Sequence, residues 1–306
     1  MIIDCHLHLI KNLNIFCGKG EGMANPEAGR IDFPNGEVMN LLPVPKELGN
    51  NAFLAEDALK LMKENHIDKA VLVQAGFYGY QNQYYYEVAK KYPDIFYPAG
   101  AVDPFCSGAM DIVRNLVENW GFRILKFECS EGTGLCSIHP DFRVDAPYME
   151  EIYQYAAEHD VAVVFDLGGK TQRSYQLQAL KRMITKYRNL RFVVCHLLCP
   201  AGPDLPYWES DLKTVLADNV WLDISTVPVF CGEQYPFPGA LRYIEKAVEM
   251  AGKDKVMWGS DAPGNLSLIP DMSKLLDYLQ HSTVLTSGEL DAILGENVAH
   301  AYNLNV

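Results

Sequence analysis

Two histidines lie one residue apart near the start of the chain, directly after a short apolar run. The segment reads Ile2-Ile3-Asp4-Cys5-His6-Leu7-His8. Because side chains alternate between the two faces of a strand, His6 and His8 are expected on one face, with Cys5 on the other. Imidazole nitrogen is a favoured ligand of zinc and similar divalent cations. The pair therefore predicts a metal site, although two ordinary buried histidines would give the same pattern.

Further ionisable residues follow or close other apolar runs of the chain. Such groups at the ends of buried strands are costly unless they are paired or bound to a metal. The pattern therefore predicts a metal centre or a buried acid–base cluster. The metal ligands predicted from it are His6, His8, Asp166 and Asp261, and His196, Lys126 and Glu128 belong to the same set of strand residues.

This ligand set predicts a specific chemistry. A cation held by two histidines and one or two carboxylates keeps a position open for water and lowers the pKa of that water. Asp261 is the predicted general base, and His196 is predicted to polarise a carbonyl or orient the substrate. Simpler interpretations also exist: Asp261 is a common residue type at a helix N-cap, and Lys126 with Glu128 would also serve as a buried ion pair.

The strands that position these residues are predicted from short apolar runs that alternate with helix-like segments. Eight such alternations in one chain fit an α/β fold, a single (β/α)8 TIM barrel spanning residues 1–306 as one domain. A doubly wound open sheet is the alternative, but the first strand is not followed by a glycine-rich dinucleotide loop. The predicted strands are Met1–Cys5, Ala70–Gln74, Phe96–Val102, Arg123–Phe127, Val161–Phe165, Arg191–Cys195, Val220–Ile224 and Val256–Gly259. The helix-like segments are Ala55–Asn65, Tyr148–His159, Gln176–Lys186, Leu241–Ala251, Met272–Gln280 and a final one over Leu290–Leu304.

The connection after the first strand, Leu9–Phe53, is unusually long and shows no convincing periodicity. Loops of this length in compact domains are either functional or disordered. Since this one leaves the end of the strand that carries the histidines, it is interpreted as a lid over the pocket, with disorder as the rival interpretation.

The composition excludes several classes of protein. A net charge of −13 argues against a nucleic-acid-binding surface, and no apolar run is long enough to cross a membrane. The first residues do not read as a secretory signal, and the eight cysteines do not read as a disulfide framework. A cytoplasmic location is therefore predicted. The predicted partner is a small-molecule substrate, and a homodimer is the oligomer considered, because barrels of this kind often pair.

Cys195-His196-Leu197-Leu198-Cys199 also has the residue types of a thiolate metal site. Strand alternation, however, would turn Cys195 away from His196. The sequence therefore gives this site little support.

Taken together, several segments resemble the amidohydrolase superfamily, and in particular its branch of aminocarboxymuconate semialdehyde decarboxylase, aromatic-acid decarboxylases and pyrone dicarboxylate lactonases. The resemblance implies a (β/α)8 barrel with a divalent metal at His6, His8 and Asp261, and with His196 near the reacting carbon. It rests on Ile3-Asp4-Cys5-His6-Leu7-His8, Val194-Cys195-His196, Trp221-Leu222-Asp223-Ile224-Ser225, Trp258-Gly259-Ser260-Asp261-Ala262-Pro263 and Gly295-Glu296-Asn297-Val298-Ala299.

The chain departs from this family at strand five, where metal-dependent members usually have a histidine ligand and this chain has Asp166. Either Asp166 replaces the histidine as a ligand, or the metal is weakly held or absent. Lys126 is similar to the strand-four lysine that is carboxylated in binuclear members. Because Lys126 is followed by Phe127 and Glu128 rather than ending its strand, a single metal ion is predicted.

Three hypotheses follow for the function. The first is a hydrolase that activates water for attack on a lactone, amide or ester, and the second is a non-oxidative decarboxylase of an unsaturated or aromatic acid. The third is a binding barrel that lost its metal when strand five acquired Asp166. Zinc is the expected metal, with manganese or iron as alternatives. The substrate is expected to be anionic, with Lys126, Glu128, Lys170 and Arg173 as the predicted substrate-binding residues.

Overall fold

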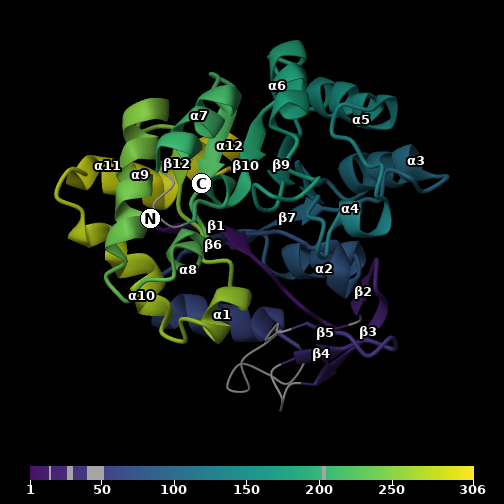
Figure 1. The fold of residues 1–306 in the computed structure, drawn as a ribbon, viewed down its shortest axis with the longest axis horizontal. Coiled ribbons are helices and arrows are strands. Elements are labelled where there is room, and N and C mark those ends of the chain that lie inside the picture. The colour runs from purple at the N-terminus through teal and green to yellow at the C-terminus, as the bar shows by residue number, and fades with distance from the viewer. Residues whose placement is uncertain (14, 26–29, 40–51, 202–204) are drawn as a thin grey trace.

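The protein is a closed barrel of eight parallel strands surrounded by helices (Figure 1). The computed structural model describes residues 1–13, 15–25, 30–39, 52–201 and 205–306. The barrel strands follow one another around the sheet in chain order: β1 Ile3–Leu7, β6 Lys69–Leu72, β7 Phe96–Gly100, β8 Ile124–Glu128, β9 Ala162–Asp166, β10 Phe192–Val194, β11 Val220–Asp223 and β12 Val256–Met257. Each of the eight predicted strands is confirmed.

The sheet closes on itself where the segment after β12 pairs with β1. The Asp261 N–H donates to the His6 carbonyl (2.7 Å), and the His8 N–H donates to the Ala262 carbonyl (2.8 Å). Leu7 and Ala262 form a parallel bridge at the same place. This seam completes the (β/α)8 barrel by placing the last strand beside the first.

The α-helices around the barrel are α1 Ala55–Glu64, α2 Asn82–Lys91, α3 Ala109–Arg114, α4 Leu135–Ile138, α5 Pro147–Glu158, α6 Leu177–Lys186, α7 Leu205–Val215, α8 Val227–Cys231, α9 Pro238–Ala251, α10 Met272–Asp277, α11 Ser287–Asp291 and α12 Asn297–Tyr302, with a π-helix, η7 Ala292–Glu296, leading into α12. The six helix-like segments expected from the sequence are present, as α1, α5, α6, α9, α10 and the stretch from α11 to α12. Among the described residues, no helix is both long enough and apolar enough to cross a bilayer.

Apolar side chains fill the inside of the barrel below the strand ends that carry the histidines. This interior cluster takes residues from the barrel strands and from α12. Val298, Ala301 and Tyr302 of α12 belong to it, and Asn303, just after α12, donates to Asp160 before β9 (2.8 Å). The last helix therefore closes the barrel at the amino ends of the strands. The histidines lie at the opposite, carboxyl ends.

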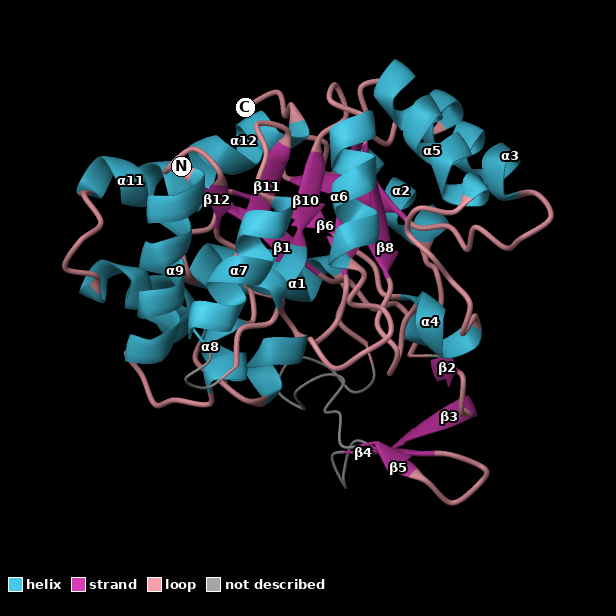
Figure 2. Cartoon of the chain, turned by 45° about the horizontal axis from the view of Figure 1, so that its top comes forward, coloured by secondary structure: helices cyan, strands magenta, loops and turns pink. Residues whose placement is uncertain are grey.

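The connection after β1 contains a second, smaller sheet that the sequence analysis did not predict. Four antiparallel strands form it: β2 Ile15–Cys17, β3 Gly20–Asn25, β4 Arg30–Asp32 and β5 Val38–Met39. The sheet lies beside the barrel (Figure 2) and has its own small core, which includes Ile15, Ile31 and Phe33. Strands of two to six residues, partly glycine and charged residues, are too short to show a period.

The lid interpretation of this connection stays a prediction. Ile10 and Leu13, at its beginning, line the cavity described below. Part of the connection, residues 14, 26–29 and 40–51, lies outside the described residues.

Gly259 allows the close approach of β1 at the seam. A Cβ atom at this position would lie 2.7 Å from the Cβ atom of His6 and 3.0 Å from the sulfur of Cys5. We expect Gly259→Ala to lower the free energy of unfolding by about 1–3 kcal/mol, because the packed strands have to move apart. Urea unfolding measures this. Gly288→Ala is the control, since a Cβ there meets no atom within 4 Å; equal losses in the two variants would contradict the role given to Gly259.

Candidate metal centre and its cavity

Three of the four predicted metal ligands come together at the seam. The Nε2 atoms of His6 and His8 are 3.1 Å apart, and Oδ1 of Asp261 lies 3.0 Å from Nε2 of His8 and 3.7 Å from Nε2 of His6. Ligand bonds of about 2.1 Å place two donors about 3.0–3.4 Å apart at ordinary coordination angles. Two imidazole nitrogens and one carboxylate oxygen therefore fit a single divalent cation.

Outer hydrogen bonds orient these donors. Nδ1 of His6 lies 2.6 Å from the Asp223 carboxylate, and Nδ1 of His8 lies 2.7 Å from the Tyr78 hydroxyl. The Thr226 hydroxyl donates to Oδ2 of Asp261. Each contact occupies the atom that faces away from the other ligands, which leaves both Nε2 atoms and Oδ1 directed at one point.

Asp223, Tyr78 and Thr226 were not among the predicted site residues. Asp223 closes β11 in the way that Asp166 closes β9, so an acid at the end of a buried strand was the signal that could have found it. We find no comparable sequence signal for Tyr78 or Thr226.

The protonation of the histidines suits metal binding. Burial lowers the pKa of His6 to about 4, with a further contribution from the charge of Lys126, and the nearby Asp223 only partly opposes this. Burial also lowers the pKa of His8. Burial disfavours ionisation of Asp261, yet the neighbouring histidines hold the pKa of this carboxyl below its usual range. At neutral pH the set therefore offers two neutral imidazoles and one carboxylate.

Asp166 and His196 form a separate pair beside these ligands. Oδ2 of Asp166 lies 3.3 Å from Nε2 of His196, whose Nδ1 lies 3.0 Å from the Ser225 hydroxyl. Although burial disfavours the charged imidazolium, the charge and hydrogen bond of Asp166 raise the pKa of His196 to about 9. His196 therefore carries a proton at neutral pH, and the role of Asp166 as a fourth ligand stays a prediction.

Both groups open into a cavity of about 210 Å³ at the ends of the strands. It is lined by His6, His8, Ile10, Leu13, Ala75, Tyr78, Lys126, Glu128, Ser130, Thr133, Asp166, His196, Asp261, Pro263 and Gly264. A second cavity of about 540 Å³ adjoins it and shares Ser130, Asp166, His196 and Asp261.

The four predicted substrate-binding residues lie in three different places in the structure. Lys126 and Glu128 are buried and line the first cavity. Lys170 lines the second cavity, where its Nζ lies 3.5 Å from the carboxylate of Asp211. Arg173 lines neither cavity and instead pairs with Glu131 at the surface.

Glu128 is an unusual carboxyl group. One oxygen accepts the Ser130 N–H (2.9 Å), and the other is buried with no hydrogen-bond partner in the described structure. Burial, reinforced by the charge of Asp166, raises the pKa of Glu128 to about 7. Glu128 is therefore able to exchange a proton near neutral pH.

The backbone turns left-handed where strand ends deliver site residues. His196, Thr226 and Asp261 have φ angles of 57°, 65° and 52°. Such conformations cost about 1–3 kcal/mol each in non-glycine residues and persist only where the surrounding structure enforces them. Their presence at three site residues places part of the backbone strain of the fold at these strand ends.

Two predictions based on strand alternation are corrected, one by the left-handed turn after β10 and one by a register shift in β1. β10 ends at Val194, so Cys195 does not turn away from His196: their donor atoms lie within 4.8 Å of each other. At β1, the register shifts between Asp4 and Leu7. As a result Cys5 packs in the barrel interior below His6, although the sequence analysis placed it on the opposite face.

Comparisons with known proteins agree with this architecture. The model of the amidohydrolase family matches residues 3–304. A search of curated proteins found no match.

Solved structures share the fold at low sequence identity. An amidohydrolase from Burkholderia multivorans with bound zinc is 16% identical over all of both chains, with a TM-score of 0.75. A probable 2-pyrone-4,6-dicarboxylic acid hydrolase from Acinetobacter baumannii, with citric acid bound, is 16% identical over 99% of both chains (TM-score 0.69). A 5-carboxyvanillate decarboxylase from Sphingomonas paucimobilis is 15% identical over 85% of this chain and 86% of that one (TM-score 0.62).

The hydrogen bond that Asp223 accepts from Nδ1 of His6 makes a testable contribution to metal binding. We expect Asp223→Asn to weaken zinc binding about 10- to 100-fold, because His6 loses the charge that orients it and strengthens its donation. Competition with a chelating dye measures the affinity. Asp103→Asn is the matched control, because Asp103 pairs with His139 at 2.7 Å and lines neither cavity. Equal affinity of the two variants would exclude the proposed role.

Glu128 links stability to pH. The folded protein holds the Glu128 proton up to about pH 7, whereas an unfolded glutamate loses it near its ordinary pKa of 4.5. The destabilisation therefore grows as the pH rises from 4.5 to 7, is complete above pH 7, and is absent below pH 4.5. We expect Glu128→Gln to raise the free energy of unfolding by about 1–3 kcal/mol at pH 8 and to change it little at pH 4.5. Urea unfolding at both pH values measures this, and a gain that is the same at both would contradict the raised pKa.

Proposed function

Since the chain belongs to the amidohydrolase family and is an enzyme, we propose that it is a metal-dependent hydrolase that cleaves a lactone, amide or ester in a small anionic substrate. The observation that carries the proposal is the convergence of His6, His8 and Asp261 on one point of the cavity that also holds the protonated His196. The named structural relatives include both a probable hydrolase and a decarboxylase. These relatives therefore do not decide between the two reactions, and hydrolysis is the part that we propose.

His6, His8 and Asp261 are the residues that would hold the cation. Zinc suits two imidazoles and a carboxylate, and a cation held there would lower the pKa of a water and polarise a carbonyl. Manganese and iron accept the same donors. Asp166 would complete the set only by leaving its partner His196.

Asp261 is proposed to accept the proton of the attacking water. Oδ1 faces the histidines and would bind the cation, so Oδ2, which accepts from the Thr226 hydroxyl, is the oxygen left to take the proton. The carboxylate is ionised at neutral pH because its histidine neighbours lower its pKa. A base fixed at this place works as a general base without losing the geometry of the ligand set.

His196 is proposed to supply a proton on the opposite side of the reacting carbonyl. Ser225 fixes Nδ1, which leaves Nε2 as the donating atom, and Asp166 keeps that nitrogen protonated. A charged donor in a buried site stabilises the negative charge that develops on the carbonyl oxygen or the leaving group.

Lys126 is proposed to bind an anionic group of the substrate. It is 2% exposed and lines the cavity. Burial disfavours its charge, but the surrounding acidic groups more than offset this and raise the pKa of Lys126. The carboxylic acids in the names of the relatives support an acid as substrate: 2-pyrone-4,6-dicarboxylic acid and bound citric acid in one case, 5-carboxyvanillate in another.

Decarboxylation is the second candidate, supported by the decarboxylase among the structural relatives. The same pair, His196 and Asp166, would then deliver the proton to carbon as carbon dioxide leaves. Lys126 would bind the carboxylate that is lost or its neighbour.

The two reactions differ in their products. Zinc-loaded protein is incubated with a panel of lactones, esters and amides of small carboxylic acids, and with aromatic and unsaturated carboxylic acids. Acid release is followed by pH-stat, and carbon dioxide by a coupled assay. We expect acid release without carbon dioxide; carbon dioxide release would replace the hydrolase by the decarboxylase, and activity on neither panel would contradict the proposal.

Variants assign the roles of the two proton-transfer residues. We expect Asp261→Asn and His196→Asn to lower kcat by at least about 100-fold, in the range of lost general acid–base catalysis. His139→Asn is the control because its partner is Asp103 and it lines neither cavity. An active His196→Asn variant would remove His196 from the proposed mechanism.

A further inference from the structure

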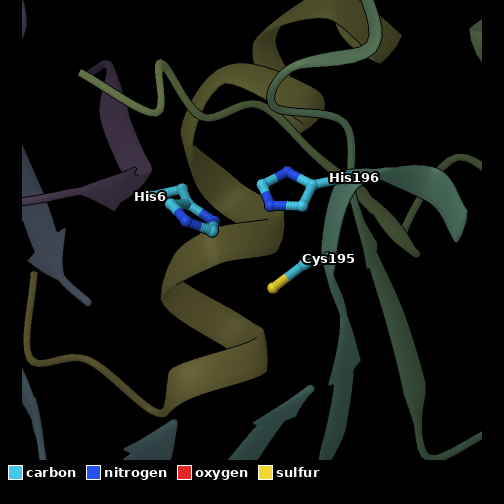
Figure 3. Close-up of side chains that lie close together, drawn as sticks. All are labelled: His6, Cys195 and His196. Carbon is cyan, nitrogen blue, oxygen red and sulfur yellow. The ribbon is translucent and has the colours of Figure 1, made fainter. Parts of the chain in front are cut away.

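A cysteine thiol lies next to two of the site histidines, on the interior side of the barrel. Donor atoms of His6, Cys195 and His196 lie within 4.8 Å of one another, and all three residues are buried (Figure 3). Cys195 has no part in the proposed hydrolysis. Its position follows from the end of β10 at Val194 and the left-handed turn that begins at His196.

This group and the His6–His8–Asp261 group share His6. Because Nδ1 of His6 is engaged by Asp223 at 2.6 Å, Nε2 is the atom available to either group. One nitrogen lone pair binds one cation, so the two groups are alternatives around the same imidazole. They differ in character, since a thiolate favours softer cations than a carboxylate does.

We propose that His6, Cys195 and His196 form a second cation position that takes a thiophilic divalent cation such as zinc or cadmium. This position goes beyond the proposed function and competes with it. Its ligands are two imidazoles and one thiolate, a combination of nitrogen and sulfur that zinc accepts.

Burial raises the pKa of the Cys195 thiol well above its usual range, so a cation that binds there has to displace the thiol proton. Three carboxylates, Asp166, Asp223 and Asp261, act on the thiol and favour a cation, whereas the ammonium of Lys126 opposes one. Binding forms a bond from the cation to the sulfur and one to the His196 ring, and it releases the thiol proton and the imidazolium proton to solvent. The cost of burying charge is thereby shared between the cation and the acids around it.

Occupation of this position has a functional consequence. His196 as a ligand no longer carries the proton that the proposed hydrolysis requires, and His6 is withdrawn from the other ligand set. The position is therefore an inhibitory one, in which an excess of thiophilic cation turns the enzyme off.

Cobalt reports sulfur ligation directly, because a cobalt–thiolate bond gives a charge-transfer band in the near ultraviolet. The metal-free full-length protein is titrated with cobalt chloride, and the band is followed in the wild type and in Cys195→Ser, Cys199→Ser and His8→Ala variants. We expect the band in the wild type, its loss in Cys195→Ser, and its retention in Cys199→Ser, which removes a thiol that lines the second cavity. His8→Ala removes a ligand of the other set alone, so the band is expected to persist there.

Absence of the band in the wild type at saturating cobalt, or its persistence in Cys195→Ser, would overturn the proposal. X-ray absorption of the cadmium-loaded wild type is a second measurement that needs no variant. A first coordination shell of cadmium without sulfur would also overturn the proposal. The outcomes are separate from those of the proposed function. A hydrolase without the cobalt–sulfur band refutes only the second position, whereas a band in a protein without hydrolase activity refutes only the hydrolase.

Discussion

The backbone pairing that closes the barrel is the constraint on which the site depends. His6 and Asp261 belong to opposite ends of the chain and become neighbours because the Asp261 N–H donates to the His6 carbonyl. The buried Asp4 carboxylate reinforces this contact, since one of its oxygens accepts both the His6 N–H and the Ser260 N–H (2.9 Å each). The same few hydrogen bonds therefore hold the last strand against the first and fix the spacing of the candidate metal ligands.

Burial alone would neutralise every ionisable group at this seam, so the neighbours of each group decide its charge. His6 is neutral because burial and Lys126 outweigh Asp223, whereas His196 is charged because Asp166 outweighs burial. Two imidazoles whose rings are 4.8 Å apart thus have opposite protonation states. One is prepared to donate a lone pair and the other to donate a proton, which is the division of roles on which the proposed hydrolysis rests.

The sequence contains the barrel in a readable form and the site only in part. The eight strands are predictable because each is a continuous apolar run. The candidate metal ligands are predictable because charged residues at the ends of such runs are rare. The direction of Cys195 was not predictable, since a period of two fails where the backbone turns left-handed. Contacts between distant segments were also hidden: Asp223 and His6 are 217 residues apart, and the surface pairing of Arg173 with Glu131 depends on two loops meeting.

The packing of α12 against the barrel determines how molecules reach the cavity. Tyr302 and its neighbours fill the space beneath the candidate ligands, so in the described part of the chain the middle of the barrel is packed and not open. Substrate and product would therefore both pass through the opening of the cavity at the ends of the strands. A product that leaves slowly would then block the entry of the next substrate molecule.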